Sequence, residues 1–304
     1  MSHTELDNLE NAPFLSNYQN PDASLQISMD PDPVIPAALD VGFLDDECRD
    51  LTFQGLCYKV PGKKRDILHD VSGHVPAGQL CGVLGPSGAG KSSLFDVLLG
   101  QEDGSVYKGS LPRLSPESIA YVTQEITLVT SETCFECLKF YADLSLPTFT
   151  SERTKIELVE DTLAGMDLNH CAHLAVGGKS LQTGAQVDGV SRGERRRVFV
   201  GCSLVRKPQG LILDEPTTGL DATNSLQVVK VLSQYCKSRD IPTIVSLHQP
   251  RPEILMSMDL VLLLARGRVI FWGSVDGMLP YLTSQHVEVD ANENPADFAL
   301  DYIS

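Results

Sequence analysis

The sequence predicts an α/β fold with a mainly parallel sheet, joined by a small antiparallel β-layer and a helical lobe. Short apolar runs at residues 80–84, 210–213, 243–247 and 260–264 alternate with helical patterns, which implies a parallel sheet covered on both faces. Apolar residues recur every three and four positions through residues 133–199, as in packed helices. Residues 51–60 alternate as a strand, and the PGKKR that follows is typical of a hairpin turn.

The first 50 residues form a distinct acidic segment. They contain eleven Asp and Glu residues and one basic residue, Arg49, in a chain of 304 residues with a formal charge of -16. The segment contains several prolines and no regular spacing of apolar residues. It can therefore not bury enough apolar surface to offset the conformational entropy that it would lose on ordering. We therefore predict a mostly disordered tail over residues 1–50 and a globular domain over residues 51–304.

The composition disfavours several classes of protein. The N-terminal segment lacks the basic flank and apolar stretch of a signal peptide, and the apolar run Leu260–Ala265 is far shorter than the roughly 20 residues that span a bilayer. We expect no transmembrane segment and a cytosolic location. Eight irregularly spaced cysteines predict reduced thiols, and the single CxxC at Cys134 and Cys137 argues against zinc. The acidic balance argues against nucleic acid as a partner.

The strand at residues 80–84 leads into a glycine-rich loop and a helix from Lys91 to about Leu99. Residues 85–92 read GPSGAGKS and satisfy GxxxxGK[ST], in which glycines let backbone N–H groups converge on phosphate at a helix N-terminus. Lys91 is expected to reach the β- and γ-phosphates, and the Ser92 hydroxyl to bind Mg²⁺. The residues predicted to bind the nucleotide here are Gly85, Ser87, Gly88, Gly90, Lys91, Ser92 and Ser93.

The strand at residues 210–213 ends in two adjacent acids, Asp214 and Glu215. Neighbouring residues at a strand end point in different directions. We therefore expect Asp214 to face Mg²⁺ and Glu215 to face the attacking water as general base. A solvated acidic turn is the alternative for this motif taken alone.

Those two motifs fit many NTPases, including small-molecule kinases and GTPases, so the motifs that follow decide between them. Gln124 lies in AYVTQ, Ser191 opens SRGE, Asp221 closes TTGLD and His248 lies in VSLHQP. This succession resembles the ABC ATPases, whose Q-loop, signature, D-loop and H-loop come in that order.

The wording of the motifs resembles the G subfamily, the half-transporters of the White type. The matching stretches are CYKV, GPSGAGKSSLFDVLLG, LKFYADLSLP, GERRRV, LDEPTTGLDATNS, SLHQPRPEI and NPADFALDYIS. Together they span Leu51 to Ser304. The resemblance implies a P-loop NTPase with a RecA-like core, an antiparallel β-subdomain and an α-helical subdomain over about residues 127–200.

The resemblance also implies roles for single residues. Tyr58 would stack on adenine, although its position suits a core aromatic equally well. Gln124 would contact Mg²⁺ and the water and signal to a membrane partner, and His248 would hydrogen-bond the γ-phosphate. Asp221 would lie at a dimer interface. The remaining residues, Ser191 and Gly193, would reach the ATP held by the opposite subunit.

We therefore predict an ATP-hydrolysing cassette that uses ATP and Mg²⁺ on the cytoplasmic face of a membrane. Its expected partners are a second nucleotide-binding domain, identical or not, and the transmembrane domain of an ABC transporter, whose helices follow NPADF in the family and are not part of this chain. Arg192 replaces a family glycine, which keeps open a non-hydrolysing regulatory module. A soluble ABC protein acting on ribosomes is disfavoured, because such proteins resemble paired cassettes and often carry basic segments.

Overall fold

The computed structural model describes residues 49–59, 66–100, 108–112, 114–179, 184–285, 294, 296, 299 and 300, all within one compact unit. Of the acidic tail expected over residues 1–50, only the last two lie in these ranges. The hairpin turn expected at residues 61–65 lies outside them.

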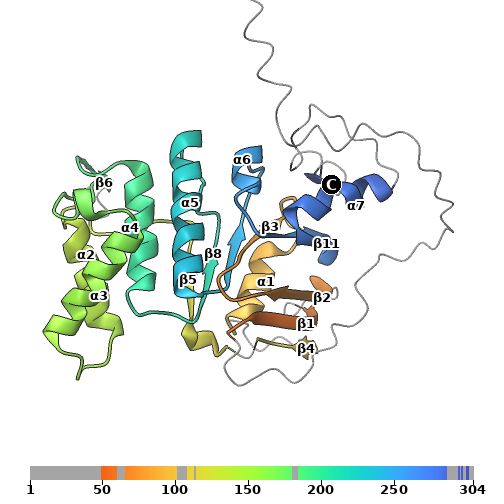
Figure 1. Cartoon of the computed structure of the whole chain (residues 1–304), viewed down its shortest axis with the longest axis horizontal. Coiled ribbons are helices and arrows are strands. Elements are labelled where there is room, and N and C mark those ends of the chain that lie inside the picture. The colour runs from red at the N-terminus through yellow and green to blue at the C-terminus, as the bar shows by residue number, and fades with distance from the viewer. Residues whose placement is uncertain are drawn as a thin grey trace, which may run out of the picture. The chain divides into compact units, whose positions relative to one another are not determined.

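A six-stranded sheet forms the centre of the domain, in the order β11-β10-β3-β9-β8-β5 (Figure 1). All neighbours pair in parallel except β10 and β11, which form an antiparallel hairpin at one edge. The prediction of a mainly parallel sheet is confirmed. The strands are β3 (Leu80–Leu84), β5 (Ile119–Val122), β8 (Gly210–Leu213), β9 (Thr243–Ser246), β10 (Leu260–Ala265) and β11 (Arg268–Ser274).

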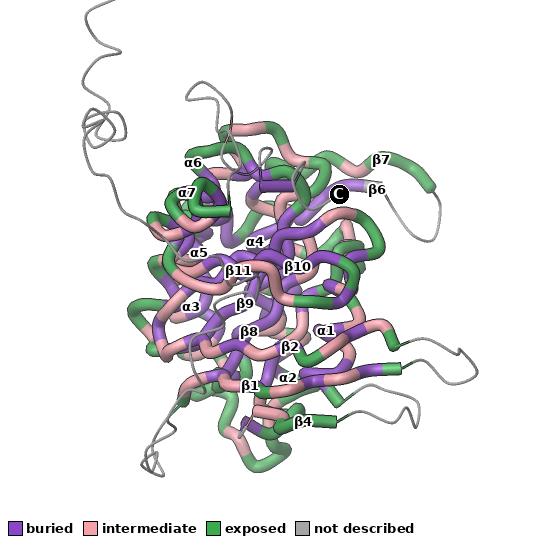
Figure 2. Tube along the Cα trace, turned by 90° about the vertical axis from the view of Figure 1, so that its right-hand side faces the viewer, coloured by how far each residue is buried: buried purple, intermediate pink, exposed green. Residues whose placement is uncertain are grey.

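The central strands are short and apolar because helices cover the sheet. Every residue of β3, β8 and β9 is buried. Figure 2 shows β8 and β9 in the colour of buried residues. The strand β5, next to β8, was not predicted, because its four residues have no distinctive pattern. The helices that connect and follow the strands are α1 (Lys91–Leu98), α5 (Ala222–Arg239), α6 (Pro252–Leu255) and α7 (Val275–Ser284).

A three-stranded antiparallel layer lies beside α1, with β1 (Leu51–Tyr58) between β2 (Leu68–Val75) and β4 (Lys108–Ser110). Phe53 and Leu56 of β1 belong to one buried cluster with Leu94 and Phe95 of α1. Burial of this apolar surface joins the antiparallel layer to the helix that follows the phosphate loop. A short 3-10 turn, η1 (Pro116–Ser118), leads from this layer to β5.

Helices α2, α3 and α4 gather at the opposite end of the unit from β1 and β2 (Figure 1). Apolar faces of α2 and α4 meet in the main core, where Leu138 and Val198 are fully buried. The helical lobe contains α2 (Cys134–Ser145), α3 (Glu152–Gly165), η2 (Asn169–Cys171), the two-stranded β6 (Gly178–Lys179) and β7 (Gln186–Val187), and α4 (Arg192–Leu204).

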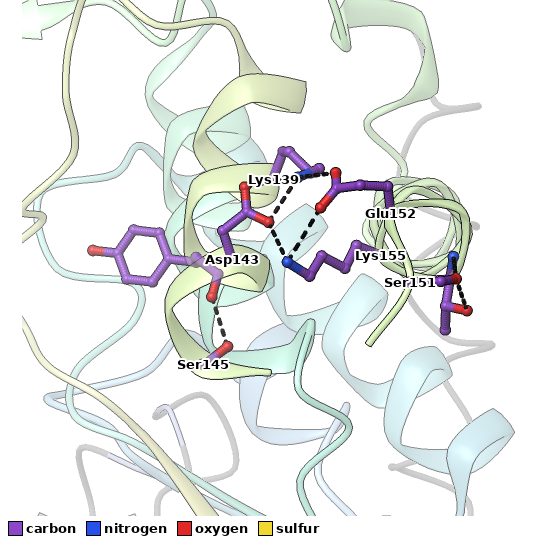
Figure 3. Close-up of polar contacts among 8 residues, drawn as sticks. Lys139, Asp143, Ser145, Ser151, Glu152 and Lys155 are labelled. Carbon is purple, nitrogen blue, oxygen red and sulfur yellow. Dashed lines mark hydrogen bonds and ion pairs between the residues drawn. The ribbon is translucent and has the colours of Figure 1, made fainter. Parts of the chain in front are cut away.

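An exposed ion-pair network joins α2 to α3 (Figure 3). Lys139 lies 2.7 Å from Asp143 and 2.9 Å from Glu152, and Lys155 lies 2.9 Å from Asp143 and 3.3 Å from Glu152. Each lysine therefore bridges one carboxylate on each helix. These contacts link α2 to α3 at the surface of the helical lobe.

None of the helices in the described ranges combines the length and the apolar character needed to cross a bilayer.

Candidate nucleotide-binding site

The predicted phosphate loop connects β3 to α1. The ammonium of Lys91 donates hydrogen bonds to the carbonyls of Gly85 at 2.6 Å and Pro86 at 3.2 Å, and the residue is only 9% exposed. Burial lowers the pKa of Lys91, and the nearby charges of Glu215 and Asp214 partly offset this. Lys91 of the loop and both predicted acids are therefore close enough for their charges to interact.

Two glycines with positive φ give the loop one packed side and one open side. A Cβ at Gly90, with φ of 107°, would lie 2.9 Å from the Leu68 side chain, whereas a Cβ at Gly88, with φ of 79°, would meet nothing within 4 Å. Ser87 and Ser92 are exposed beside this open stretch. The loop is therefore open at Gly88, next to the N-terminus of α1, a position that suits a phosphate group.

The loop is anchored to the turn between β10 and β11. The amide of Gly267 donates to the carbonyl of Ala89 at 2.9 Å, and the amide of His69 donates to the carbonyl of Gly267 at 2.8 Å. A Cβ at Gly267 would fall 1.8 Å from the Ile67 carbonyl oxygen, so only glycine fits there. These bonds hold the loop between the hairpin and β2.

The two acids lie just beyond the end of β8. The amide of Asp214 still donates to Val122 of β5 at 2.9 Å, but Glu215 has a left-handed backbone with φ of 44°. We expected strand alternation to separate the two side chains. The two side chains do take different partners, Ser246 for Asp214 and Gln124 for Glu215. Because the strand ends at Leu213, a left-handed turn and not strand alternation sets the direction of Glu215.

The carboxylate of Glu215 is held by two donors. Its Oε2 accepts from the side-chain amide of Gln124 at 2.9 Å and from the hydroxyl of Thr218 at 2.8 Å. Gln124 follows β5 and Glu215 follows β8, and these strands are neighbours in the sheet. The structure therefore brings the predicted Q-loop glutamine and the predicted general base together.

Negative charge gathers around Asp214. Burial raises the pKa of Asp96, on α1, and the charge of Asp214 raises it further. Burial raises the pKa of Tyr121, on β5, to about 12, with further contributions from Asp214 and Asp96. Asp214 also acts on the charge of Lys91 in the phosphate loop. Carboxylates near that loop are hard oxygen donors of the kind that Mg²⁺ prefers.

The predicted signature serine caps α4. The amide of Glu194 donates to the Ser191 hydroxyl at 3.2 Å, and the amide of Ser191 donates to Glu194 Oε2 at 2.8 Å, which is a capping box. His170 lies 2.7 Å from Glu194 Oε1. Ligand atoms of His170, Cys171 and Glu194 lie within 4.8 Å of one another, and the hydrogen bond between His170 and Glu194 accounts for this proximity.

The signature and the predicted D-loop lie side by side. A Cβ at Gly193 would fall 2.6 Å from Oδ1 of Asn224, a residue in the first turn of α5. The Asn224 side chain donates to Asp221 Oδ1, and Asp221 is the N-cap of α5. Ser191, Arg192 and Asp221 are all exposed at these two helix ends.

Two residues predicted to contact the nucleotide, Tyr58 and His248, make no side-chain hydrogen bond or ion pair with the phosphate loop or the acids among the described residues. Tyr58 ends β1 and is 7% exposed within the buried cluster that contains Leu68. This burial matches the core-aromatic alternative, and stacking on adenine stays a prediction. His248 follows β9 by two residues and is exposed, and its side chain makes no hydrogen bond or ion pair with another described residue.

Two residues that organise the site, Arg196 and Ser246, were not predicted from the sequence. The guanidinium of Arg196, on α4, donates to the Gln124 carbonyl at 2.9 Å and so ties the signature helix to the Q-loop. Burial lowers the pKa of Arg196, and the neighbouring Arg195 lowers it further. The Ser246 hydroxyl contacts the carboxylate of Asp214 and the backbone amide of Glu215. Its only signal in the sequence is a polar residue after the apolar pair Ile244 and Val245, two positions before His248.

Comparison with known proteins agrees with this geometry. The family profile described as ABC transporter matches residues 68–218. ABC transporter G family member 22 of Dictyostelium discoideum is 37% identical over 263 residues, covering 84% of this chain and 42% of that protein. ATP-binding cassette sub-family G member 8 of Homo sapiens is 37% identical over 246 residues, covering 78% of this chain and 36% of that protein.

The chain thus spans well under half the length of these curated relatives. Among solved structures, cbiO1 of Clostridium perfringens, part of the ABC transporter complex cbiONQ, matches with a TM-score of 0.62 at 23% identity. The match covers 76% of this chain and 90% of that one, and it supports the same fold.

Proposed function

The chain belongs to the ABC transporter family as a nucleotide-binding domain of the G type, and from this membership we propose that it binds and hydrolyses Mg-ATP to drive transport. The observation that carries the proposal is the convergence of Lys91, Asp214, Glu215 and Gln124 beside an open phosphate loop. They come from three separate segments: Lys91 from the phosphate loop, Gln124 from the loop after β5, and the two acids from the turn after β8. A glycine turn with a purely structural role would not require the other two segments.

The residues divide the chemistry among them. The loop amides and Lys91 would bind the β- and γ-phosphates, and Ser92, Asp214 and Gln124 would hold the metal. Bound Mg²⁺ would neutralise charge on the triphosphate. Glu215 is the candidate general base, since Gln124 and Thr218 already orient its carboxylate. His248, exposed at the end of β9, would complete the site from the γ-phosphate side.

The proposal includes a head-to-tail dimer. Ser191 and Asp221 cap α4 and α5 and are exposed, and the contact between Gly193 and Asn224 keeps the two helix ends together. Helix N-termini favour anions. This pair of ends would close over the ATP held by a second domain, so an isolated chain should hydrolyse ATP slowly.

A transmembrane partner would dock on the helical lobe, at the cytoplasmic face of a membrane. Apolar side chains on and beside α2 are exposed, with Phe140 at 55%, Leu144 at 68% and Phe149 at 89%. Covering apolar side chains of this size with a partner removes them from water and so favours binding. They lie on the same lobe as the signature helix, which Arg196 joins to Gln124.

A second candidate function is an ATP-dependent regulatory module that does not hydrolyse ATP. One observation favours it, because Arg192 is exposed at the first position of α4, where the family has a glycine. The intact Lys91, Asp214 and Glu215 favour hydrolysis instead.

ATP turnover of wild type against Glu215→Gln separates the two functions. We expect slow turnover that Glu215→Gln abolishes, together with a dimer that this variant forms in Mg-ATP and that size-exclusion chromatography with light scattering detects. Glu253→Gln, an exposed acid in the first turn of α6, serves as the matched control and should turn over as wild type. Equal turnover in wild type and Glu215→Gln would remove Glu215 from the chemistry.

A further inference from the structure

Ser246, the last residue of β9, contacts both acids of the site through a single hydroxyl. The side chain is fully buried, with 0% exposure. Its Oγ donates to Asp214 Oδ1 at 2.6 Å and accepts from the backbone amide of Glu215 at 2.8 Å. One small side chain thus fixes a carboxylate and, one residue later, the backbone of the candidate base.

The Glu215 amide needs this acceptor because the chain leaves the sheet there. Pairing of β8 with β9 ends at Leu213 and Val245, so the next amides have no ladder partner on that side. With φ of 44°, Glu215 turns its amide toward β9 instead of continuing the strand. An unpaired amide at this depth would be unfavourable, and a left-handed non-glycine residue persists only when its surroundings hold it.

The direction of the bond to Asp214 also matters. A serine hydroxyl has one proton, and here it is given to Oδ1, so Oδ2 is free of this bond. The Tyr121 hydroxyl also hydrogen-bonds to the Asp214 carboxylate, so Ser246 and Tyr121 together fix its direction. Hydrogen bonds of this kind to metal-binding carboxylates set both orientation and affinity.

We propose that Ser246 is a positioning residue that orients Asp214 toward Mg²⁺ and holds the turn that aims Glu215 at Gln124. This inference rests on the proposed function, because it assigns Ser246 a task in that site. The hydroxyl acts through Asp214 and Glu215 and touches no substrate itself.

Thr243 offers a matched control at the other end of β9. It is also 0% exposed, and its hydroxyl lies 2.9 Å from Cys236 Sγ and 3.3 Å from the Ile241 carbonyl, away from both acids. Ser246→Ala and Thr243→Val therefore each remove one buried hydroxyl from the same strand. A loss caused by weaker folding should appear in both, and a loss of positioning only in Ser246→Ala.

The experiment measures three quantities for wild type and both variants: the melting temperature, the affinity for ATP in EDTA and in Mg²⁺, and turnover as a function of Mg²⁺. We expect Ser246→Ala to lower kcat about 10- to 100-fold and to raise the half-activating Mg²⁺ concentration several-fold. Its ATP affinity in EDTA should stay within about twofold of wild type, because the phosphate loop is untouched. Thr243→Val should keep the Mg²⁺ dependence of wild type.

Wild type and Glu215→Gln are measured first, so that absent turnover is recognised as a failure of the proposed function. If wild type shows no turnover, the gain in ATP affinity on adding Mg²⁺ still tests the role of Ser246, because this measurement requires binding and no hydrolysis. An equal gain in wild type and Ser246→Ala overturns the inference. The inference is also overturned if both β9 variants lose turnover in proportion to the drop in their melting temperatures.

Discussion

The side-chain amide of Gln124 donates a 2.9 Å hydrogen bond to the carboxylate of Glu215, although the two residues are 91 positions apart in the chain. The bond links the loop after β5 to the turn after β8. Arg196 holds the carbonyl of the same glutamine from the signature helix, so three motifs meet at one residue. A change in the helical lobe can therefore reach the candidate base through a short, defined path.

Removing the Gln124 amide should slow chemistry and leave nucleotide binding intact. In Gln124→Ala the Glu215 carboxylate keeps its bond from Thr218 and loses its bond from the Gln124 amide. We expect turnover to fall by at least about 10-fold, by analogy with the loss of one orienting donor. The ATP affinity measured in EDTA should stay within about twofold of wild type, because the phosphate loop is unchanged. Steady-state kinetics and calorimetry measure the two quantities.

Thr217→Val is the control for that substitution. Thr217 lies beside Thr218, and no hydrogen bond of its side chain is recorded among the described residues. Turnover of Gln124→Ala equal to that of wild type would show that this bond has no part in the reaction.

Gly193→Ala should impair turnover through the D-loop. The new Cβ would lie 2.6 Å from Asn224 Oδ1, so Asn224 must move and its bond to Asp221 must change. ATP binding by the phosphate loop should persist. The clash involves the side chain of Asn224 alone. Gly193→Ala should therefore lower turnover less when it is introduced into the Asn224→Ala variant than when it is introduced into wild type. A double-mutant cycle measures this coupling, and strictly additive losses would contradict it.

Arg192→Gly is predicted to raise ATP turnover. Arg192 begins α4 and is exposed beside Ser191, where a backbone is expected to approach the phosphates of a partner-bound ATP closely. The bulk of the guanidinium should keep the two domains apart. Arg153→Gly is the control, because Arg153 is also an exposed arginine in the first turn of a helix, α3. An unchanged or lower rate in Arg192→Gly refutes this role.

Asp143→Asn tests the ion-pair network of the helical lobe. Hydrogen bonds from Lys139 and Lys155 lower the pKa of Asp143, so its contribution to stability is present above the ordinary carboxyl pKa and is lost as pH falls through the lowered value. At neutral pH and low salt we expect a melting temperature lower by about 1 to 2 °C, since exposed pairs contribute little. The difference should shrink in 1 M salt and vanish in strong acid.

Glu160→Gln, an exposed acid on α3 with no ion pair among the described residues, is the matched control for the network. A difference between Asp143→Asn and wild type that survives both high salt and strong acid would exclude an electrostatic cause.

How far the sequence predicted the site depended on how local each feature is. The phosphate loop and the acids after β8 could be predicted, because strand, turn and helix are encoded within a few residues. The bond from Ser246 to Asp214 joins residues 32 positions apart, and no local pattern marks such a pair. The direction of Glu215 was likewise hidden, since it depends on a left-handed residue that propensity does not favour.

Tyr58 shows a different limit. Alternation correctly predicted the strand that it ends, with buried and less buried residues along β1. An aromatic residue at that position suits a core and a ligand platform alike, and only the packing around Leu68 shows how deeply it is buried.

Calorimetric titration with Mg-ATP tests the central claim most directly, by comparing wild type with Lys91→Met. Lys91 is buried and its ammonium bonds only to loop carbonyls among the described residues, so the substitution should leave the fold intact and remove the cation that meets the phosphates. We predict that wild type takes up about one ATP per chain and that Lys91→Met, at an unchanged melting temperature, takes up none. Equal uptake by both proteins, or no uptake by wild type, would contradict the account.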